Sequence, residues 1–177
     1  MRLFFAVFLG DDVRNELEKL QEQIRAQAYK GSFTRPENLH LTLAFLGETP
    51  EERLKELHPI IREINSPSFC LAFNRTGYFT HSQKELWWIG ADSKDPDLPR
   101  LNLVHEQLIN HLEKESFPVD KRPFNAHITL GREIKHSKPI VLNFLEIQVM
   151  VDRISLVKSE RIDGVLTYTE KIGRAHV

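Results

Sequence analysis

Two copies of one nine-residue segment carry the side chains in this sequence that are best suited to chemistry. Residues 35–43 read RPENLHLTL and residues 122–130, which start 87 positions later, read RPFNAHITL, with six of nine positions identical. Each copy holds a histidine with a threonine two residues later: His40 with Thr42, and His127 with Thr129. Because an imidazole has an ordinary pKa of about 6.5, two of them can divide proton transfer at neutral pH, one as acid and one as base.

Two facing His-x-Thr units would suit a phosphate group. The imidazoles would stand near the attacking and leaving oxygens, and each threonine hydroxyl would donate a hydrogen bond to a non-bridging oxygen. Arg132, five residues beyond His127, would add a charge-assisted donor. These residue types predict displacement at a phosphodiester by side chains alone, with no metal ion or other cofactor.

Two other interpretations of the histidines stay open. A histidine in a strand is often a structural residue whose hydrogen bonds are satisfied within the fold. A metal site is the second, but zinc usually takes about four ligands, and only Glu37 and Glu133 stand beside the repeats as further donors. We therefore expect no metal site. We expect Asn38 and Asn125 to hold loop geometry by bonding backbone.

The elements that position these side chains follow from hydrophobic periodicity. Strands are expected over residues 39–46 and 126–130. Alternation then places His40 and Thr42 on one face of the first strand. The other face takes the apolar side chains of Leu41, Leu43 and Phe45.

The remaining sequence predicts an α+β fold. Apolar residues at helical spacing predict three helices, which begin at Asp11 or Asp12, after a capping Thr49, and over residues 95–99. Further strands are expected at residues 3–9, 69–79, 85–91, 147–158 and 165–172, the last two joined as a hairpin through Asp163-Gly164. Short connections favour largely antiparallel sheets, and we expect one two-lobed domain over residues 1–170.

Residues 171–177 can be read as the translation of a common sequencing-adapter DNA. One interpretation of this segment is therefore a non-native tail. For that reason His176 is not counted among the candidate site residues.

Composition narrows the classes of function. The net charge of −1 argues against general electrostatic affinity for nucleic acid, so an RNA would need a local basic site. A single cysteine, Cys70, fits a reducing compartment, and its apolar surroundings predict a buried thiol. The apolar start of the chain is short and ends at residues 10–12, which favours a first strand over a signal peptide and predicts a cytoplasmic protein. Trp87 and Trp88 alternate in a strand, so one would face outward, either packed or able to stack a base.

The two repeats and their flanks resemble the signature motifs of the two-histidine phosphoesterases. Within these, the chain most resembles the RNA 2′,3′-cyclic phosphodiesterases, also called 2′-5′ RNA ligase-like proteins, through residues 2–7 (RLFFAV), 38–47 (NLHLTLAFLG) and 122–130. The resemblance implies a bilobal duplicated fold around a V-shaped cleft. It also implies metal-independent hydrolysis of an RNA terminal 2′,3′-cyclic phosphate to a 2′-phosphomonoester. A proline commonly precedes the second histidine in this family, where this chain has Ala126.

Carried over by position, the resemblance makes His40 the proton donor to the departing 3′-oxygen and His127 the base that activates water. Thr42, Thr129 and Arg132 would bind the phosphate. The implied partners are RNA with a 2′,3′-cyclic phosphate end, tRNA halves among them, or small cyclic nucleotides. No stretch of the sequence approaches transmembrane length, so we expect no membrane partner, and we expect a monomeric protein. The alternatives are a 2′-5′ oligoribonucleotide phosphodiesterase or 2′-5′ RNA ligase activity at the same site, or a non-catalytic module that binds RNA ends.

Overall fold

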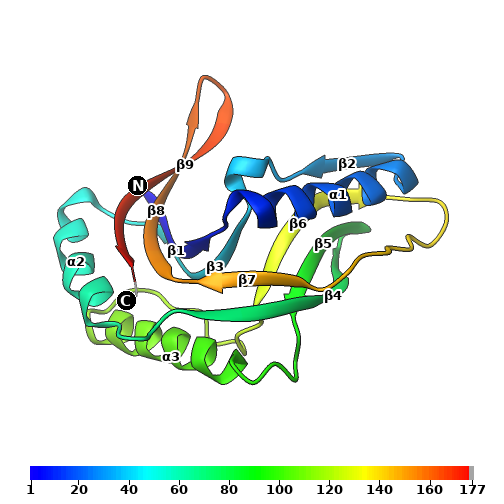
Figure 1. Cartoon of the computed structure of the whole chain (residues 1–177). Helices are drawn as coiled ribbons and strands as arrows, with labels where there is room; N and C mark the ends of the chain where they lie inside the picture. The colour runs from blue at the N-terminus through cyan, green and yellow to red at the C-terminus, as the bar shows by residue number, and fades with distance from the viewer. Residues whose placement is uncertain (176–177) are drawn as a thin grey trace.

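The computed structural model describes residues 1–175, in which antiparallel strands form one sheet flanked by three α-helices (Figure 1). The strands are β1 (Arg2–Phe8), β2 (Lys30–Phe33), β3 (His40–Glu48), β4 (Phe69–His81), β5 (Lys84–Ala91), β6 (His127–Lys135), β7 (Ile147–Val151), β8 (Arg153–Ile162) and β9 (Val165–Ala175). The α-helices are α1 (Asp11–Gln27), α2 (Leu54–Glu63) and α3 (Leu98–Lys114), and the 3-10 turns are η1 (Pro36–Asn38) and η2 (Glu51–Arg53). The predicted class, a mixed helix and strand fold with antiparallel pairing, is confirmed.

The strand order is symmetric about the two repeat strands. It runs β7-β4-β5-β6-β3-β1-β8-β9, with β2 paired to β6 outside this path. In the described residues β3 and β6 share one antiparallel pair, Leu41 opposite Ile128, after which the strands diverge. Three further strands extend on each side. The two sequence repeats therefore meet at the middle of the sheet.

The helices cross between the two halves of the sheet. Helix α1 follows β1 but contacts β6 and β7 in the other half, and α3 follows β5 but contacts β3. Helices α2 and α3 lie side by side at one end of the molecule, and α1 lies at the other (Figure 1). Most buried side chains form one large core that spans both halves, with Phe5, Leu41 and Ile128 fully enclosed. A small second cluster consists of Phe4, Ala6 and Val157. Each half thus depends on a helix that the other half supplies.

Several expected elements differ in detail. Residues 30–33, for which the hydrophobic pattern predicts no strand, form β2 and pair with β6. The strand expected over 147–158 is broken at Asp152 into β7 and β8, which pair with β4 and β1. Neither helix start has the expected cap: no side chain in residues 1–175 caps α1, and the Thr49 hydroxyl bonds the Gly47 carbonyl instead.

Residues 171–175 and Cys70 also differ from what the sequence predicted or suggested. Residues 171–175 of the suspected tail continue β9 along β8, and His176 lies outside the described residues. The domain boundary at residue 170 stays a prediction. Cys70 is exposed rather than buried, because it faces away from the core between two buried neighbours, and its Sγ lies 3.8 Å from Met150 Sδ.

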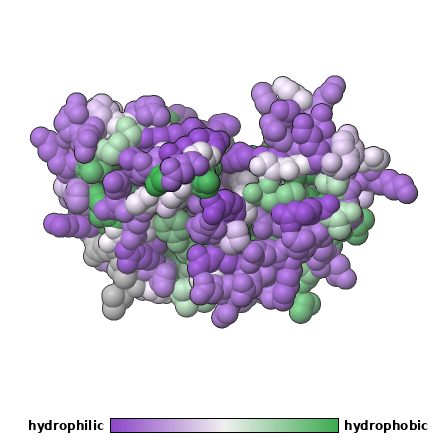
Figure 2. Space-filling model, turned by 90° about the horizontal axis from the view of Figure 1, so that it is seen from above, coloured by the Kyte–Doolittle hydropathy of each residue, from purple (hydrophilic) through white to green (hydrophobic). Residues whose placement is uncertain are grey.

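Surface properties add two observations. No helix in the part of the chain that the structure describes is long and apolar enough to cross a membrane. The face of the molecule seen from above is mostly hydrophilic, and its hydrophobic side chains are scattered in small patches (Figure 2). This face therefore resembles a solvent-exposed protein surface rather than an extended apolar contact surface.

Candidate active site

The five predicted site residues lie on one face of the sheet, which we call the histidine face: His40, Thr42, His127, Thr129 and Arg132. The antiparallel pair of Leu41 and Ile128 sets their relation, since residues on either side of it point to the opposite face. That register sets each histidine level with the threonine of the other repeat. The two His-x-Thr units are thus related by an approximate half turn about the Leu41–Ile128 pair.

Both repeat strands carry the same irregularity after the threonine. Over their first six positions β3 and β6 share one burial pattern, in which two consecutive buried residues interrupt the alternation. The register of β3 against β1 shifts just after Thr42, and that of β6 against β5 shifts just after Thr129. Because a bulge inserts one extra residue, the alternation shifts by one position after it, and a side chain that strict alternation would place on the apolar face lies on the histidine face. The bulges bring Phe45 in the first repeat, and Arg132 in the second, onto the histidine face.

The bulge corrects one expectation. Phe45 was expected in the apolar row with Leu41 and Leu43, but its side chain is 59% exposed and its ring lies 5.8 Å from that of Phe4. Arg132 is exposed, and its positive charge helps to lower the pKa of His40. Equivalent positions of the two repeats therefore carry an aromatic ring in β3 and a guanidinium in β6.

Each imidazole is held by a backbone carbonyl two residues before it. Nδ1 of His40 lies 2.6 Å from the Asn38 oxygen, and Nδ1 of His127 lies 2.7 Å from the Asn125 oxygen. Because a carbonyl only accepts, Nδ1 carries a proton in both rings and Nε2 is the atom directed at chemistry. The Asn38 side chain donates to the Leu166 carbonyl at 3.0 Å, which confirms its expected role in holding the loop.

The surroundings of the two histidines differ. Thr42 Oγ1 lies 2.8 Å from His40 Nε2, and the rings of Phe4 and Tyr168 lie 5.0 and 5.3 Å from the His40 ring. Burial lowers the pKa of His40, and the charges of Arg132 and His127 lower it further, against an opposing contribution from the Asn38 carbonyl. At neutral pH the His40 imidazole is therefore uncharged in the free protein, and it accepts the Thr42 hydroxyl proton.

His127 is bordered by aromatic rings from the other half of the sheet. The rings of Phe79 and Trp88 lie 5.7 and 6.3 Å from its ring, both edge-on. Of the two tryptophans, Trp87 is buried and donates from Nε1 to Glu85 at 2.8 Å, whereas Trp88 lies on the histidine face. Alternation predicted that one of the two tryptophans would face outward. Trp88 is that residue, because it lies opposite Thr129 in the pairing of β5 with β6.

Four further aromatic residues flank the histidines and were not predicted as part of the site: Phe4, Phe8, Phe79 and Tyr168. They come from β1, β4 and β9, far from the repeats in sequence. Burial raises the pKa of the Tyr168 hydroxyl, against a smaller lowering by the charges of Arg132 and Arg2. No local signal marks these residues, because strand order alone brings them to the site.

Comparison with known proteins agrees with this geometry. The family model described as LigT-like phosphoesterase matches residues 7–88 and 95–167. The chain belongs to the LigT-like phosphoesterases. The family resemblance predicted from the two repeats is thereby confirmed.

Relatives of this LigT-like phosphoesterase are similar over most of its length. The RNA 2′,3′-cyclic phosphodiesterase of Thermotoga maritima is 31% identical over 167 residues, which cover 90% of this chain and 87% of the relative. The protein of that name from Escherichia coli is 31% identical over 172 residues, 95% of this chain and 92% of the relative. The structure of E. coli LigT complexed with 3′-AMP has a TM-score of 0.83 at 28% identity, covering 99% of this chain and 97% of that one. A protein from Thermus thermophilus has a TM-score of 0.82 at 31% identity, with the same coverage.

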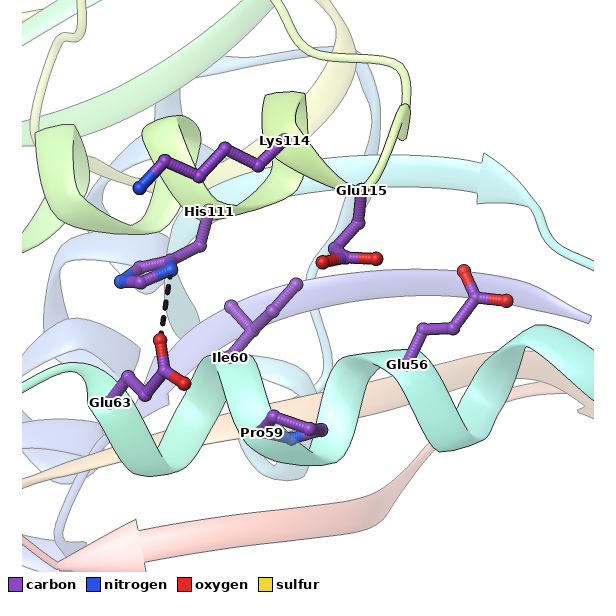
Figure 3. A pocket seen from close by; sticks show the side chains of 7 residues that line it. All are labelled: Glu56, Pro59, Ile60, Glu63, His111, Lys114 and Glu115. Atoms are coloured by element: carbon purple, nitrogen blue, oxygen red, sulfur yellow. Dashed lines mark ion pairs between the residues drawn. The ribbon is translucent and has the colours of Figure 1, made fainter.

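A hollow of this LigT-like phosphoesterase lies away from the repeats, between α2 and α3 (Figure 3). Its volume is about 230 Å³, and across it His111 Nδ1 lies 3.2 Å from a Glu63 carboxylate oxygen. The residues that line it are Glu56, Pro59, Ile60, Glu63, His111, Lys114 and Glu115. None of the predicted site residues borders this hollow, so we place the candidate site on the histidine face.

The histidine face of this LigT-like phosphoesterase has the groups that an anionic tetrahedral centre requires. Two Nε2 atoms can exchange protons, two hydroxyls can donate hydrogen bonds, and one guanidinium supplies positive charge. Within residues 1–175 no three His, Cys, Asp or Glu side chains are grouped as a metal ion would need. Metal-independent chemistry stays a prediction, to be tested by chelation.

Proposed function

We propose that this chain hydrolyses the 2′,3′-cyclic phosphodiester at the 3′ end of RNA to a 2′-phosphomonoester, without a metal ion. Its family makes it a phosphoesterase, and its relatives named RNA 2′,3′-cyclic phosphodiesterase support the substrate class. The structure of E. coli LigT with 3′-AMP supports a nucleotide ligand. The observation that carries the proposal is the pair of His-x-Thr units on either side of one strand pair, with Arg132 on the same face.

The proposed reaction assigns one task to each of these groups. Nε2 of His127 takes a proton from water as its oxygen attacks phosphorus. The bond from phosphorus to the 3′-oxygen then breaks, and Nε2 of His40 gives its proton to that oxygen. Thr42, Thr129 and Arg132 donate hydrogen bonds to the non-bridging oxygens, where charge accumulates in the transition state.

His40 must be protonated to act as this acid, although its pKa is lowered in the free protein. The substrate supplies the opposing effect, because a phosphodiester carries a negative charge. Two unit charges about 4 Å apart attract by about 4 kcal/mol at an effective dielectric constant of about 20. One unit of pKa corresponds to about 1.4 kcal/mol, so the bound anion outweighs a moderate lowering by burial. In this proposal the charge of the bound substrate raises the pKa of His40, and the imidazole takes up its proton from solvent before it acts as the acid.

Phosphorus NMR of the products from cytidine 2′,3′-cyclic phosphate tests the proposal. Accumulation of the 2′-phosphate is the expected result, and a 3′-phosphate or an unchanged substrate would contradict it. A 2′-5′ dinucleotide offered in the same assay measures the alternative phosphodiesterase activity. Action on tRNA halves, a monomeric state and a cytoplasmic location remain predictions that accompany this proposal.

A further inference from the structure

The histidine face continues beyond His127 over β5 and β4. His127 lies opposite Gly90 of β5, and Gly90 lies opposite Arg75 of β4. Residues paired across antiparallel strands share a face, so Arg75 stands on the same side as the imidazole. With neighbouring strands about 4.8 Å apart, the Arg75 backbone is about 10 Å from that of His127.

An aromatic surface fills the space between these two residues. A Cβ on Gly77 would lie 2.6 Å from Trp88 Cζ2, and one on Gly90 would lie 2.9 Å from Trp88 Cζ3. The indole therefore covers both glycines, a position that is open only because neither has a side chain. Its Nε1 is buried without a hydrogen-bond partner in the part of the chain that the structure describes. The Phe79 ring lies 5.6 Å from that of Trp88, and its side chain is 47% exposed.

Arg75 leans back over Gly90 toward this surface. Its Nε donates to the Ala91 carbonyl at 2.8 Å, which orients the guanidinium. Nη2 borders the space above Gly90, 3.4 Å from where a Cβ would stand. Arg75 forms no ion pair within residues 1–175; Asp92, whose pKa its charge helps to lower, bonds Asn74 instead. The terminal amino groups of Arg75 are thus available to an anion.

We propose that Arg75 is a second phosphate subsite, which binds the phosphodiester on the 5′ side of the terminal nucleotide. The inference rests on the proposed function, which places the cyclic phosphate between His40 and His127. The nucleoside that joins the two phosphates then crosses the surface of Phe79 and Trp88. The net charge of the whole chain is −1, so binding of RNA requires a local positive charge. Arg75 would favour an RNA chain over a free cyclic nucleotide, because only the RNA chain has a phosphate on the 5′ side.

Three substrates separate this subsite from the reaction itself: cytidine 2′,3′-cyclic phosphate, the same compound with a 5′-phosphate, and the dinucleotide CpC with a terminal cyclic phosphate. We expect the 5′-phosphate and the internal phosphodiester each to raise kcat/KM by about tenfold, the size of a charge-assisted hydrogen bond. Arg75→Gln should remove that gain and leave the plain cyclic nucleotide unaffected. Arg75→Lys should keep part of it, because the ammonium retains the charge but not the planar fork.

The matched control is Arg62→Gln, the same change at an exposed arginine of α2, which should alter none of the three rates. The subsite is refuted if the 5′-phosphate brings no gain in the unaltered protein, or if Arg75→Gln slows all three substrates alike. Failure of the unaltered protein to hydrolyse the plain cyclic nucleotide would instead refute the proposed function. Calorimetric binding of cytidine 5′-phosphate to the unaltered protein and to Arg75→Gln would then still decide the subsite, since equal affinities contradict it.

Discussion

Replacement of Arg132 by glutamine should have two opposite effects on catalysis. The Arg132 charge lowers the pKa of His40, so its removal raises that pKa, while burial, the larger cause, still holds it below the ordinary value. The same replacement removes a charge-assisted donor to the phosphate, which is worth about 1.5–3 kcal/mol. Because Arg132 is exposed to solvent, we expect the lower end of this range, which is about a tenfold loss in kcat/KM.

The sign of the pH effect follows from the role proposed for His40. An acid is active while protonated, so kcat/KM falls as pH rises through the His40 pKa of the free enzyme. With a raised pKa, the descending limb of the profile moves to higher pH. The variant should therefore be slower at its optimum but should keep its activity to a higher pH than the unaltered protein.

Two measurements check this expectation. NMR titration of the His40 ring reports its pKa directly, and kcat/KM for cytidine 2′,3′-cyclic phosphate gives the rate profile over the same pH range. Arg62→Gln removes the same charge from α2 and should change neither result. A His40 ring that titrates at the same or a lower pH in Arg132→Gln would refute the electrostatic reasoning. An unchanged kcat/KM would refute a role for Arg132 at the phosphate.

Three further outcomes follow from the same site. His127→Ala should abolish hydrolysis of the cyclic phosphate while circular dichroism stays unchanged, and activity that survives would rule out His127 as the base. EDTA should leave the rate unaltered, because the proposed chemistry uses side chains alone; a large loss would point to a metal ion. Thr42→Val removes the hydroxyl 2.8 Å from His40 Nε2 and should slow kcat by about two- to tenfold, the size of a neutral hydrogen bond. Full activity in that variant would show that Thr42 does not contact the phosphate.

Alternation along the sequence predicts the face of a side chain correctly where the strand is regular. His40 and Thr42 share a face, as expected, because the first three residues of β3 alternate. The same rule fails at Phe45, since a bulge depends on the pairing with β1, which residues 39–46 do not encode by themselves. Asp152 interrupts an apolar run for a similar reason: the segments before and after it pair with strands in opposite halves of the sheet.

The aromatic part of the candidate site could not be predicted from local pattern. Tyr168 and Phe79 are ordinary strand residues in the sequence, and neither lies in a repeat. They border His40 and His127 because β9 lies three strands out from β3 and β4 lies two strands out from β6. Strand order in a sheet is decided by the packing of the whole chain. The functional signal in sequence was therefore confined to the repeats, where two histidines and two hydroxyls recur together.

The matching bulges of β3 and β6 make the histidine face asymmetric. A strict half turn about the Leu41–Ile128 pair would make the two His-x-Thr units equivalent, but burial lowers the pKa of His40 and different aromatic rings border each histidine. Phe45 and Arg132 occupy the corresponding positions after the bulges and also break that equivalence. An exchange of the two, Phe45→Arg with Arg132→Phe, would reverse the positions of the guanidinium and the ring but leave the aromatic neighbours of each histidine in place. In the proposed reaction, this pair of side chains contributes to the choice between the 2′- and 3′-oxygen as leaving group.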